Sequence, residues 1–194
     1  RVHALWGLAQ LKPKGSASKI PFRDPDAEIR AQTARLAGEL GDTAATTALL
    51  TLLSDPSPRV QFHAAMSLGK LHARTAFDPI VRMLDANRDQ DAFIRHATVM
   101  ALVGIGDVEA LSGLTSHPSN HVRAGAVVAL RRLQSPALTR YLHDPNLWVR
   151  REAVRAIHDD FSVPEALPEL AALLDEPDLP DDEVIVRRAI SANL

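Results

Sequence analysis

The chain has 194 residues, of which 46% are hydrophobic and only 4% aromatic, and it carries a formal net charge of −2 at pH 7. This composition suits a folded chain whose core is built from Ala, Leu, Val and Ile, and the charge gives no general reason to expect a nucleic-acid or anionic-membrane partner. The sequence has no cysteine and no run of the roughly 18 apolar residues that a membrane span needs, which excludes disulfides, thiolate metal sites and a transmembrane helix.

One phrase recurs along the chain: an acidic turn, a Val or Ile followed by Arg, and then an Ala- and Leu-rich segment. It returns about every 30 residues, and a period of roughly 20–50 residues is the signature of stacked repeat architectures. The Val or Ile of each phrase is Ile29, Val60, Ile94, Val122, Val149 and Val186. Arg follows this residue in every phrase except the second, which has Gln61. The repeats predict a solenoid.

Each phrase is expected to open a helix, which we term a second helix. Counting the Val or Ile as position 0, apolar residues recur at +4, +8 and +11, the 3.6-residue period of a buried helical face. The segment 60–71 shows this pattern, and 3–11 matches 63–71 closely enough to indicate an additional repeat at the start. We therefore predict seven second helices, the first and last of them incomplete.

Shorter amphipathic segments lie between these helices and are expected to form the first helix of each pair. They cover about 43–53, 77–85, 107–115, 136–142 and 164–174, and Pro168 predicts a late start or a kink in the last of them.

Two segments interrupt this pattern. The stretch 12–23 occupies a first-helix position, but its Lys, Gly, Ser and Pro residues predict a loop insertion, and 175–183 is expected to be a second, acidic loop. Because the chain opens and closes inside helical segments without polar caps, we expect a single solenoid over 1–194 that is truncated at both ends.

The two-helix unit, with Asp-Pro in the turn and Val-Arg opening the second helix, resembles HEAT repeats, in the short, Ala-rich bacterial variety of phycobilisome lyases. The resemblance implies an all-α fold, a right-handed α-α superhelix of about six to seven helix pairs that is also armadillo-like. Phrases such as HALWGLAQL and RHATVMAL also look like the HEAT segments of large extracytoplasmic bacterial proteins that carry a dehydrogenase-like propeller and a c-type haem domain. This second resemblance implies an extracytoplasmic location, with any haem outside the sequence, which has no CxxCH.

Acidic and basic residues alternate through the phrases, and the two sets are Asp24, Asp55, Asp89 and Asp144, and Arg30, Arg95, Arg123 and Arg150. They could form a track for a charged ligand. The structural alternative is that each carboxylate caps its second helix while Arg links neighbouring turns. Recurrence in every repeat favours the structural alternative.

The sequence offers little for catalysis or metal binding. Its eight histidines are spread over many repeats, and it has no HExxH motif and no His-Glu dipeptide of the kind that deoxyhypusine hydroxylases, which are HEAT proteins, use to hold iron. No Gly-x-Ser-x-Gly elbow or glycine-rich phosphate loop occurs. We therefore expect no catalytic residues, no metal and no cofactor.

Charge is unevenly distributed in the second half of the chain. Seven arginines lie in 123–155, whereas 156–186 has ten acidic residues and no Lys or Arg. A basic strip that includes Arg131, Arg132, Arg151 and Arg155 could contact nucleic-acid phosphates, as in HEAT-like DNA glycosylases. Alternatively, the following acidic repeat neutralises it.

The sharpest local signal lies on the second helices. With +4, +8 and +11 facing the core, positions +2, +6 and +9 point the opposite way and should be polar if they are merely solvated. Several carry apolar or Met side chains instead, which favours an adaptable interaction surface, a groove on the concave face that HEAT second helices line. The candidate partner-binding residues are Trp6, Phe62, Met66, His96, Met100, Val103, Val128, Arg131, Arg151 and Arg155. The alternative is that tight curvature buries these side chains between adjacent helices.

These patterns favour a non-catalytic, monomeric interaction scaffold that binds a protein, or a neighbouring domain of the same polypeptide, through the groove. Two alternatives stay open: a structural spacer domain of an extracytoplasmic redox enzyme, and a nucleic-acid-binding HEAT-like module.

Overall fold

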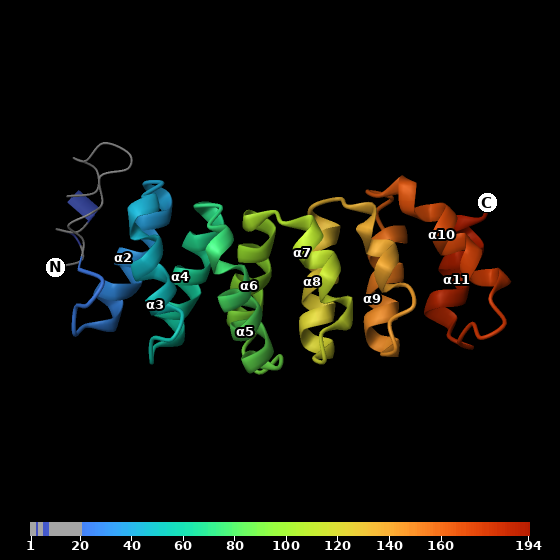
Figure 1. The fold of residues 1–194 in the computed structure, drawn as a ribbon, viewed down its shortest axis with the longest axis horizontal. Helices are drawn as coiled ribbons and strands as arrows, with labels where there is room; N and C mark the ends of the chain where they lie inside the picture. The colour runs from blue at the N-terminus through green and yellow to red at the C-terminus, as the bar shows by residue number, and fades with distance from the viewer. Residues whose placement is uncertain (1–2, 4–5, 8–20) are drawn as a thin grey trace. The chain divides into compact units, whose positions relative to one another are not determined.

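The computed structural model describes His3, Trp6, Gly7 and residues 21–194 (Figure 1). The predicted loop insertion at 12–23 lies, up to residue 20, outside the described residues. All regular secondary structure in the described part of the chain is helical. The residues group into two units, 1–106 and 107–194, and each unit is described by itself.

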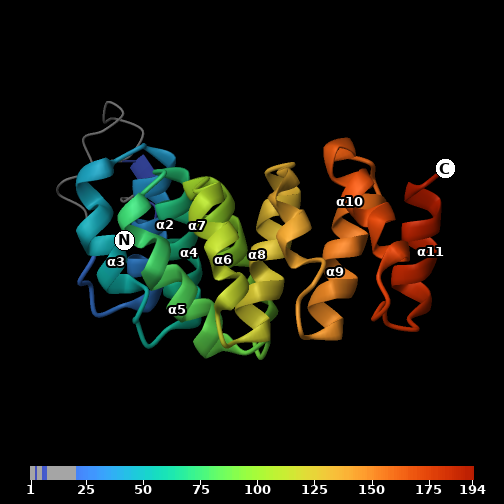
Figure 2. The ribbon, with the colours of Figure 1, turned by 45° about the vertical axis from the view of Figure 1, so that its right-hand side comes forward.

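The first unit consists of helix pairs. Its longer helices are α2 (Ala27–Glu39), α4 (Pro58–Lys70) and α6 (Ala92–Ile105), and its shorter ones are α3 (Thr46–Leu52) and α5 (Phe77–Asn87). Helix α4 lies between α2 and α6, while α3 covers α4 and α5 covers α6 (Figures 1 and 2). The longer helices are the predicted second helices, stacked side by side.

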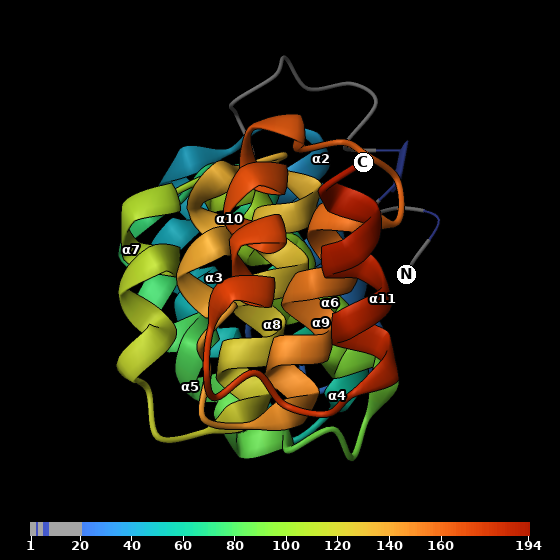
Figure 3. The same ribbon diagram turned by 90° about the vertical axis from the view of Figure 1, so that its right-hand side faces the viewer.

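The second unit repeats this arrangement. Its second helices are α8 (Asn120–Arg132), α9 (Leu147–His158) and α11 (Glu183–Ala192), with α9 packed between the other two. Helix α7 (Val108–Gly113) packs on α8, and α10 (Leu167–Ala172) packs on α11 and lies to its left in Figure 3. The predicted first helix at 136–142 is a 3-10 helix over Pro136–Tyr141 rather than an α-helix.

Cap residues and buried small side chains explain why these helices begin and pack where they do. Asp26, Asp91, Asn146 and Asp182 accept hydrogen bonds from first-turn N–H groups of α2, α6, α9 and α11. The predicted buried face is present: Val60, Ala64 and Leu68 of α4 are each fully buried. Thus capping sets the helix starts and the Ala-rich face sets the packing.

Glycine lets neighbouring second helices approach closely in the first unit. A Cβ atom added to Gly104 of α6 would lie 2.5 Å from the carbonyl oxygen of Gly69 of α4, so the two backbones are in direct contact. Likewise Ser67 Oγ of α4 donates to the carbonyl oxygen of Ala34 on α2 at 2.7 Å. Gly69, at position +9 of α4, is buried between the two helices, as the tight-curvature alternative predicts for that position.

The register predicted for the last phrase is wrong by one residue. The buried anchor of α11 is Ile185, followed by buried Ala189, whereas Val186 is only half-buried. Asp182 rather than Asp181 is the acidic residue that caps this helix, with Oδ1 accepting from the backbone N–H groups of residues 184 and 185. The last phrase therefore lacks an Arg directly after its anchor.

Candidate interaction surface

The predicted groove residues of the first unit lie on two adjacent helices. Phe62 and Met66 are on α4, and His96, Met100 and Val103 are on α6. His96 is exposed, and the other four are half-buried. The rings of Phe62 and His96 stack with centroids 6.5 Å apart and an interplanar angle of 13°. The structure thus brings these five residues together on neighbouring helices.

A cavity of about 400 Å³ lies beside Phe62, at the N-terminal ends of α4 and α6. Its walls include Arg59, Phe62 and Phe93. Phe93 is 75% exposed, and it lines this cavity together with Phe62. We refer to Phe62, Met66, Phe93, His96, Met100 and Val103 as the α4–α6 surface.

Phe93 was not among the residues predicted from the sequence. It directly precedes the anchor Ile94, a position that the +2, +6 and +9 pattern does not sample. The equivalent residue before Val149 is Trp148, which is 37% exposed in the second unit. An aromatic residue directly before the anchor is therefore the sequence feature that could have identified Phe93 and Trp148.

Charges around the cavity are largely neutralised. Arg59 Nε lies 2.8 Å from Glu28 Oε2, and a hydrogen bond from Gln32, together with Arg59, lowers the pKa of Glu28. Burial lowers the pKa of His63, and the charges of Arg59 and Arg35 lower it further, so this imidazole is neutral at pH 7. The cavity is thus lined mainly by rings and aliphatic groups.

Trp6 occupies a separate position. Its half-buried side chain packs against Leu36, and the guanidinium carbon of Arg35 lies 5.0 Å from the centroid of its ring. Arg35 is thus engaged both by this cation–π contact and by its pairing with Glu39 at 2.8 Å.

In the second unit, Val128 on α8 is the one predicted apolar residue, and it is 36% exposed. Leu147 and Trp148 on α9 are exposed to a similar extent. The rings of Trp148 and His121 are in edge-to-face contact, with their centroids 5.7 Å apart. The second unit therefore carries an apolar group of its own.

The predicted arginines of the second unit are engaged in ion pairs. Arg131 Nη2 lies 2.9 Å from Asp160 Oδ2, and Arg155 Nη1 lies 2.8 Å from Glu152 Oε1. Arg151 donates to Asp182, with 2.9 Å from its Nε to Oδ2, and this hydrogen bond lowers the pKa of Asp182. Acidic residues of the following repeat therefore neutralise Arg131 and Arg151.

Two pairs of the recurring Asp and Arg residues join consecutive repeats, whereas Arg95 pairs with Asp89 of its own repeat. Arg30 donates from Nε and Nη2 to Asp55 at 2.7 and 2.9 Å, and Arg123 holds Asp144 in the same way. The expectation that these carboxylates cap the second helices is wrong in detail. Asp55 accepts from the backbone N–H of Ser57, which is itself the cap position of α4, so it orders the turn before the helix. Asp55 Oδ1 accepts from both Ser57 N–H and Arg30 Nη2, while Oδ2 accepts from Arg30 Nε, so one carboxylate orders its own turn and bonds the preceding repeat.

Within the described residues, no three His, Cys, Asp or Glu side chains are placed to hold a metal ion. None of the described helices is long and apolar enough to cross a membrane.

The family model for HEAT repeats matches residues 17–103 and 110–192, which is most of the chain. The chain belongs to the HEAT repeat family. Its fold is accordingly an all-helical, HEAT- and armadillo-like solenoid, as the resemblance of its phrases implied.

Two solved structures are similar to this chain. The complex of CpcE and CpcF of phycocyanin lyase from Nostoc sp. PCC7120 is 20% identical and aligns with a TM-score of 0.52 over 93% of this chain and 77% of that chain. A designed armadillo repeat protein in complex with the peptide (KR)4 is 21% identical, with a TM-score of 0.45 over 90% of this chain and 98% of that one. No curated protein matches this HEAT repeat chain significantly. At these identities the likeness shows the fold alone.

Proposed function

We propose that this HEAT repeat protein is a non-catalytic scaffold that binds a partner protein, or a neighbouring domain of its own polypeptide, on the α4–α6 surface. The observation that carries the proposal is the set of incompletely buried apolar side chains on two adjacent helices, beside a cavity walled by Phe62 and Phe93. Single exposed hydrophobic residues are ordinary, but a contiguous group of them usually marks an interaction site. HEAT solenoids generally serve as protein-binding scaffolds, which supports the same conclusion.

The chemistry of the surface suits an apolar partner segment. Met66 and Met100 have flexible, polarisable side chains that adapt to the shape they meet. Phe93 offers a rigid aromatic face, and aromatic residues often dominate binding energy at interfaces. Burying an apolar side chain stabilises by about 1.5–3 kcal/mol, so a few such contacts, less the cost of ordering, correspond to a Kd on the order of 1 μM.

The test is a selection of peptides from a phage-displayed random library against the immobilised full chain, followed by affinity measurement of the enriched peptides. We compare the wild type with the double variant Met66→Asp and Met100→Asp. Two carboxylates on the α4–α6 surface would have to be desolvated on binding, so we expect at least about tenfold weaker affinity for apolar peptides.

A matched control carries the same two added charges elsewhere. Thr47 on α3 and Thr75 in the following 3-10 turn are exposed and belong to first-helix segments, so Thr47→Asp with Thr75→Asp should bind as the wild type does. Circular dichroism confirms that both variants stay helical. Enriched peptides that bind the Met variant and the wild type equally would refute binding on this surface.

A further inference from the structure

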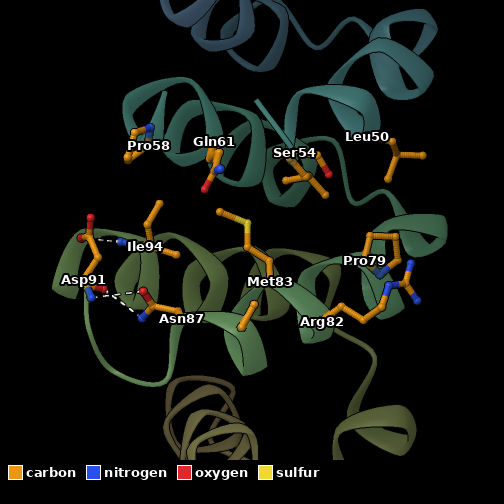
Figure 4. A pocket seen from close by; sticks show the side chains of 12 residues that line it. Leu50, Ser54, Pro58, Gln61, Pro79, Arg82, Met83, Asn87, Asp91 and Ile94 are labelled. Atoms are coloured by element: carbon orange, nitrogen blue, oxygen red, sulfur yellow. Dashed lines mark hydrogen bonds between the residues drawn. The ribbon is translucent and has the colours of Figure 1, made fainter. Parts of the chain in front are cut away.

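A second, larger cavity lies in the first unit, between the pair α3–α4 and the pair α5–α6 (Figure 4). Its volume is about 630 Å³. Gln61 and Ile94 lie toward one end together with Asp91, Met83 points into the middle, and Arg82 lies at the other end (Figure 4). The cavity adjoins the α4–α6 surface, because Asp91 and Ile94 also line the smaller cavity there.

In two other repeats, an arginine fills the equivalent position. Arg30, directly after the anchor of α2, donates from Nη1 to the carbonyl oxygen of Asp24 at 2.8 Å and from its other nitrogens to Asp55 of the next repeat. Arg123 of α8 makes the same set of bonds, to the carbonyl oxygen of His117 and to Asp144. Each guanidinium therefore occupies the gap between two repeats.

Gln61 makes only half of these bonds. Its Nε2 donates to the carbonyl oxygen of Asp55 at 2.7 Å, which corresponds to the bond from Arg30 Nη1. Gln has no further nitrogen with which to reach the next repeat. The volume and the donors that a guanidinium supplies elsewhere are thus missing here.

The acceptor side of this gap has also changed. Asp89 is the acidic turn residue of the next repeat, the one that opens with α6. It has a φ of +62° and pairs at 3.0 Å with Arg95 of that same repeat. Asn87 Oδ1 takes its place in ordering the turn and accepts from the backbone N–H of Asp91 at 3.1 Å. As a result Asp91 lines the cavity at the end where Gln61 lies.

Asp91 can accept further hydrogen bonds. Its Oδ1 takes the N–H groups of Phe93 and Ile94, which leaves Oδ2 without a donor among the described residues. Gln61 Oε1 is likewise without a donor among them. Met83 and Ile94 add aliphatic wall between the two ends. An acceptor pair beside an apolar wall is the environment that an arginine side chain needs, with its stem on the wall and its head on the oxygens.

We infer that this cavity binds an arginine side chain of a partner protein, whose guanidinium takes the place that Arg30 and Arg123 fill in their own repeats. The guanidinium donates to Asp91 Oδ2 and Gln61 Oε1, and its alkyl stem lies along Met83 and Ile94. Arg82 is exposed, has no ion pair among the described residues and lies at the opposite end of the cavity, so it favours an acidic residue adjoining the partner's arginine. This inference does not rest on the proposed function, because no residue of the α4–α6 surface lines this larger cavity.

The test is an NMR titration of the full, 15N-labelled chain with N-acetyl-arginine N-methylamide. Its matched ligand is the citrulline compound, which has the same shape but no charge. We expect the arginine compound to shift the amide resonances of Gln61 and of residues 87–94, and to bind at least about fivefold more tightly than the citrulline compound, because charge-assisted hydrogen bonds are the stronger ones.

Two variants separate this site from a general apolar cleft. Asp91→Asn keeps a good N-cap for α6 but removes the charge, so the preference for arginine over citrulline should disappear while the fold is retained. Gln61→Arg should fill the gap with the chain's own guanidinium, abolish the titration and raise Tm. Equal shifts from the two compounds, or an unchanged preference in Asp91→Asn, would overturn the inference. The Met66→Asp, Met100→Asp variant should titrate like the wild type, so failure of the proposed function and failure of this inference are distinguishable.

Discussion

Arg123 holds both carboxylate oxygens of Asp144, with 2.7 Å from Nε to Oδ2 and 3.0 Å from Nη2 to Oδ1. Both side chains are nearly inaccessible, at 8% and 2% exposure. The pair joins the turn before α8 to the turn before α9, because Arg123 Nη1 also donates to the carbonyl oxygens of His117 and Pro118. The guanidinium of Arg123 thus links two consecutive repeats by hydrogen bonds.

Replacing this arginine should destabilise the chain strongly. Arg123→Met leaves Asp144 buried without its charge partner, and loss of one member of a buried pair costs about 3–5 kcal/mol. Urea unfolding followed by circular dichroism measures the change. Arg132→Met, on the same helix but exposed, should change the free energy of unfolding by no more than about 0.5 kcal/mol. Equal effects of the two substitutions would show that the pair does not hold the repeats together.

The pair between Arg30 and Asp55 predicts a pH dependence of stability. The hydrogen bond from Arg30 lowers the pKa of Asp55 below its ordinary value of 3.8. Because the folded-state pKa is the lower one, ionised Asp55 adds stability that is fully present above the unfolded pKa and is lost as the pH falls through the folded pKa. Asp55→Asn should therefore be less stable than the wild type at about pH 7, and the difference should narrow as the pH falls below 3.8. Urea unfolding of both chains across this range is the measurement, and a difference independent of pH would contradict the assignment.

Close contact between α4 and α6 predicts opposite effects of two glycine substitutions. In Gly104→Ala the new methyl group would lie 2.5 Å from the carbonyl oxygen of Gly69, and overpacking of this kind costs about 1–3 kcal/mol. Gly113→Ala places the same group at the end of α7 with nothing within 4 Å, and it should be neutral or stabilise by up to about 1 kcal/mol. Thermal unfolding of the two variants gives the comparison; a tolerated Gly104→Ala would mean that the two helices can separate.

The ion pairs of the second unit argue against nucleic acid as the partner. Since Arg131, Arg151 and Arg155 already have carboxylate partners, few of their donors are available to phosphates. We expect no retarded band for a short DNA duplex in a gel-shift assay at about 150 mM salt. A salt-sensitive band that disappears in Arg131→Gln with Arg132→Gln would instead support the nucleic-acid alternative.

Much of the fold could be predicted from the sequence because the Val/Ile anchors impose one periodicity on every second helix. The prediction slipped at α11, where Val184, Ile185 and Val186 are all β-branched and apolar, and the adjoining acidic residues do not show which one caps the helix. Interactions between individual side chains were harder to predict. That Arg30 reaches Asp55 of the next repeat, rather than an acidic residue of its own, depends on the spacing of the repeats in three dimensions.

The candidate surfaces could be predicted only in part. Periodicity placed Phe62, Met66, Met100 and their neighbours on adjacent helices, but it omitted Phe93 because the +2, +6 and +9 positions do not include the one before the anchor. The exception at Gln61 was visible in the sequence. Its consequence, a cavity, was not, because that requires knowing what the other arginines fill.

The backbone contact between Gly69 and Gly104 fixes the distance between α4 and α6 at this point. Side chains can change rotamer to widen or narrow an ordinary helix interface, but two touching backbones leave no such adjustment. We therefore expect Met66 and Met100 to be presented at a fixed helix spacing, with adjustment left to their flexible side chains. On the proposed function, induced fit is then expected in the partner, which favours pliable segments over rigid folded surfaces.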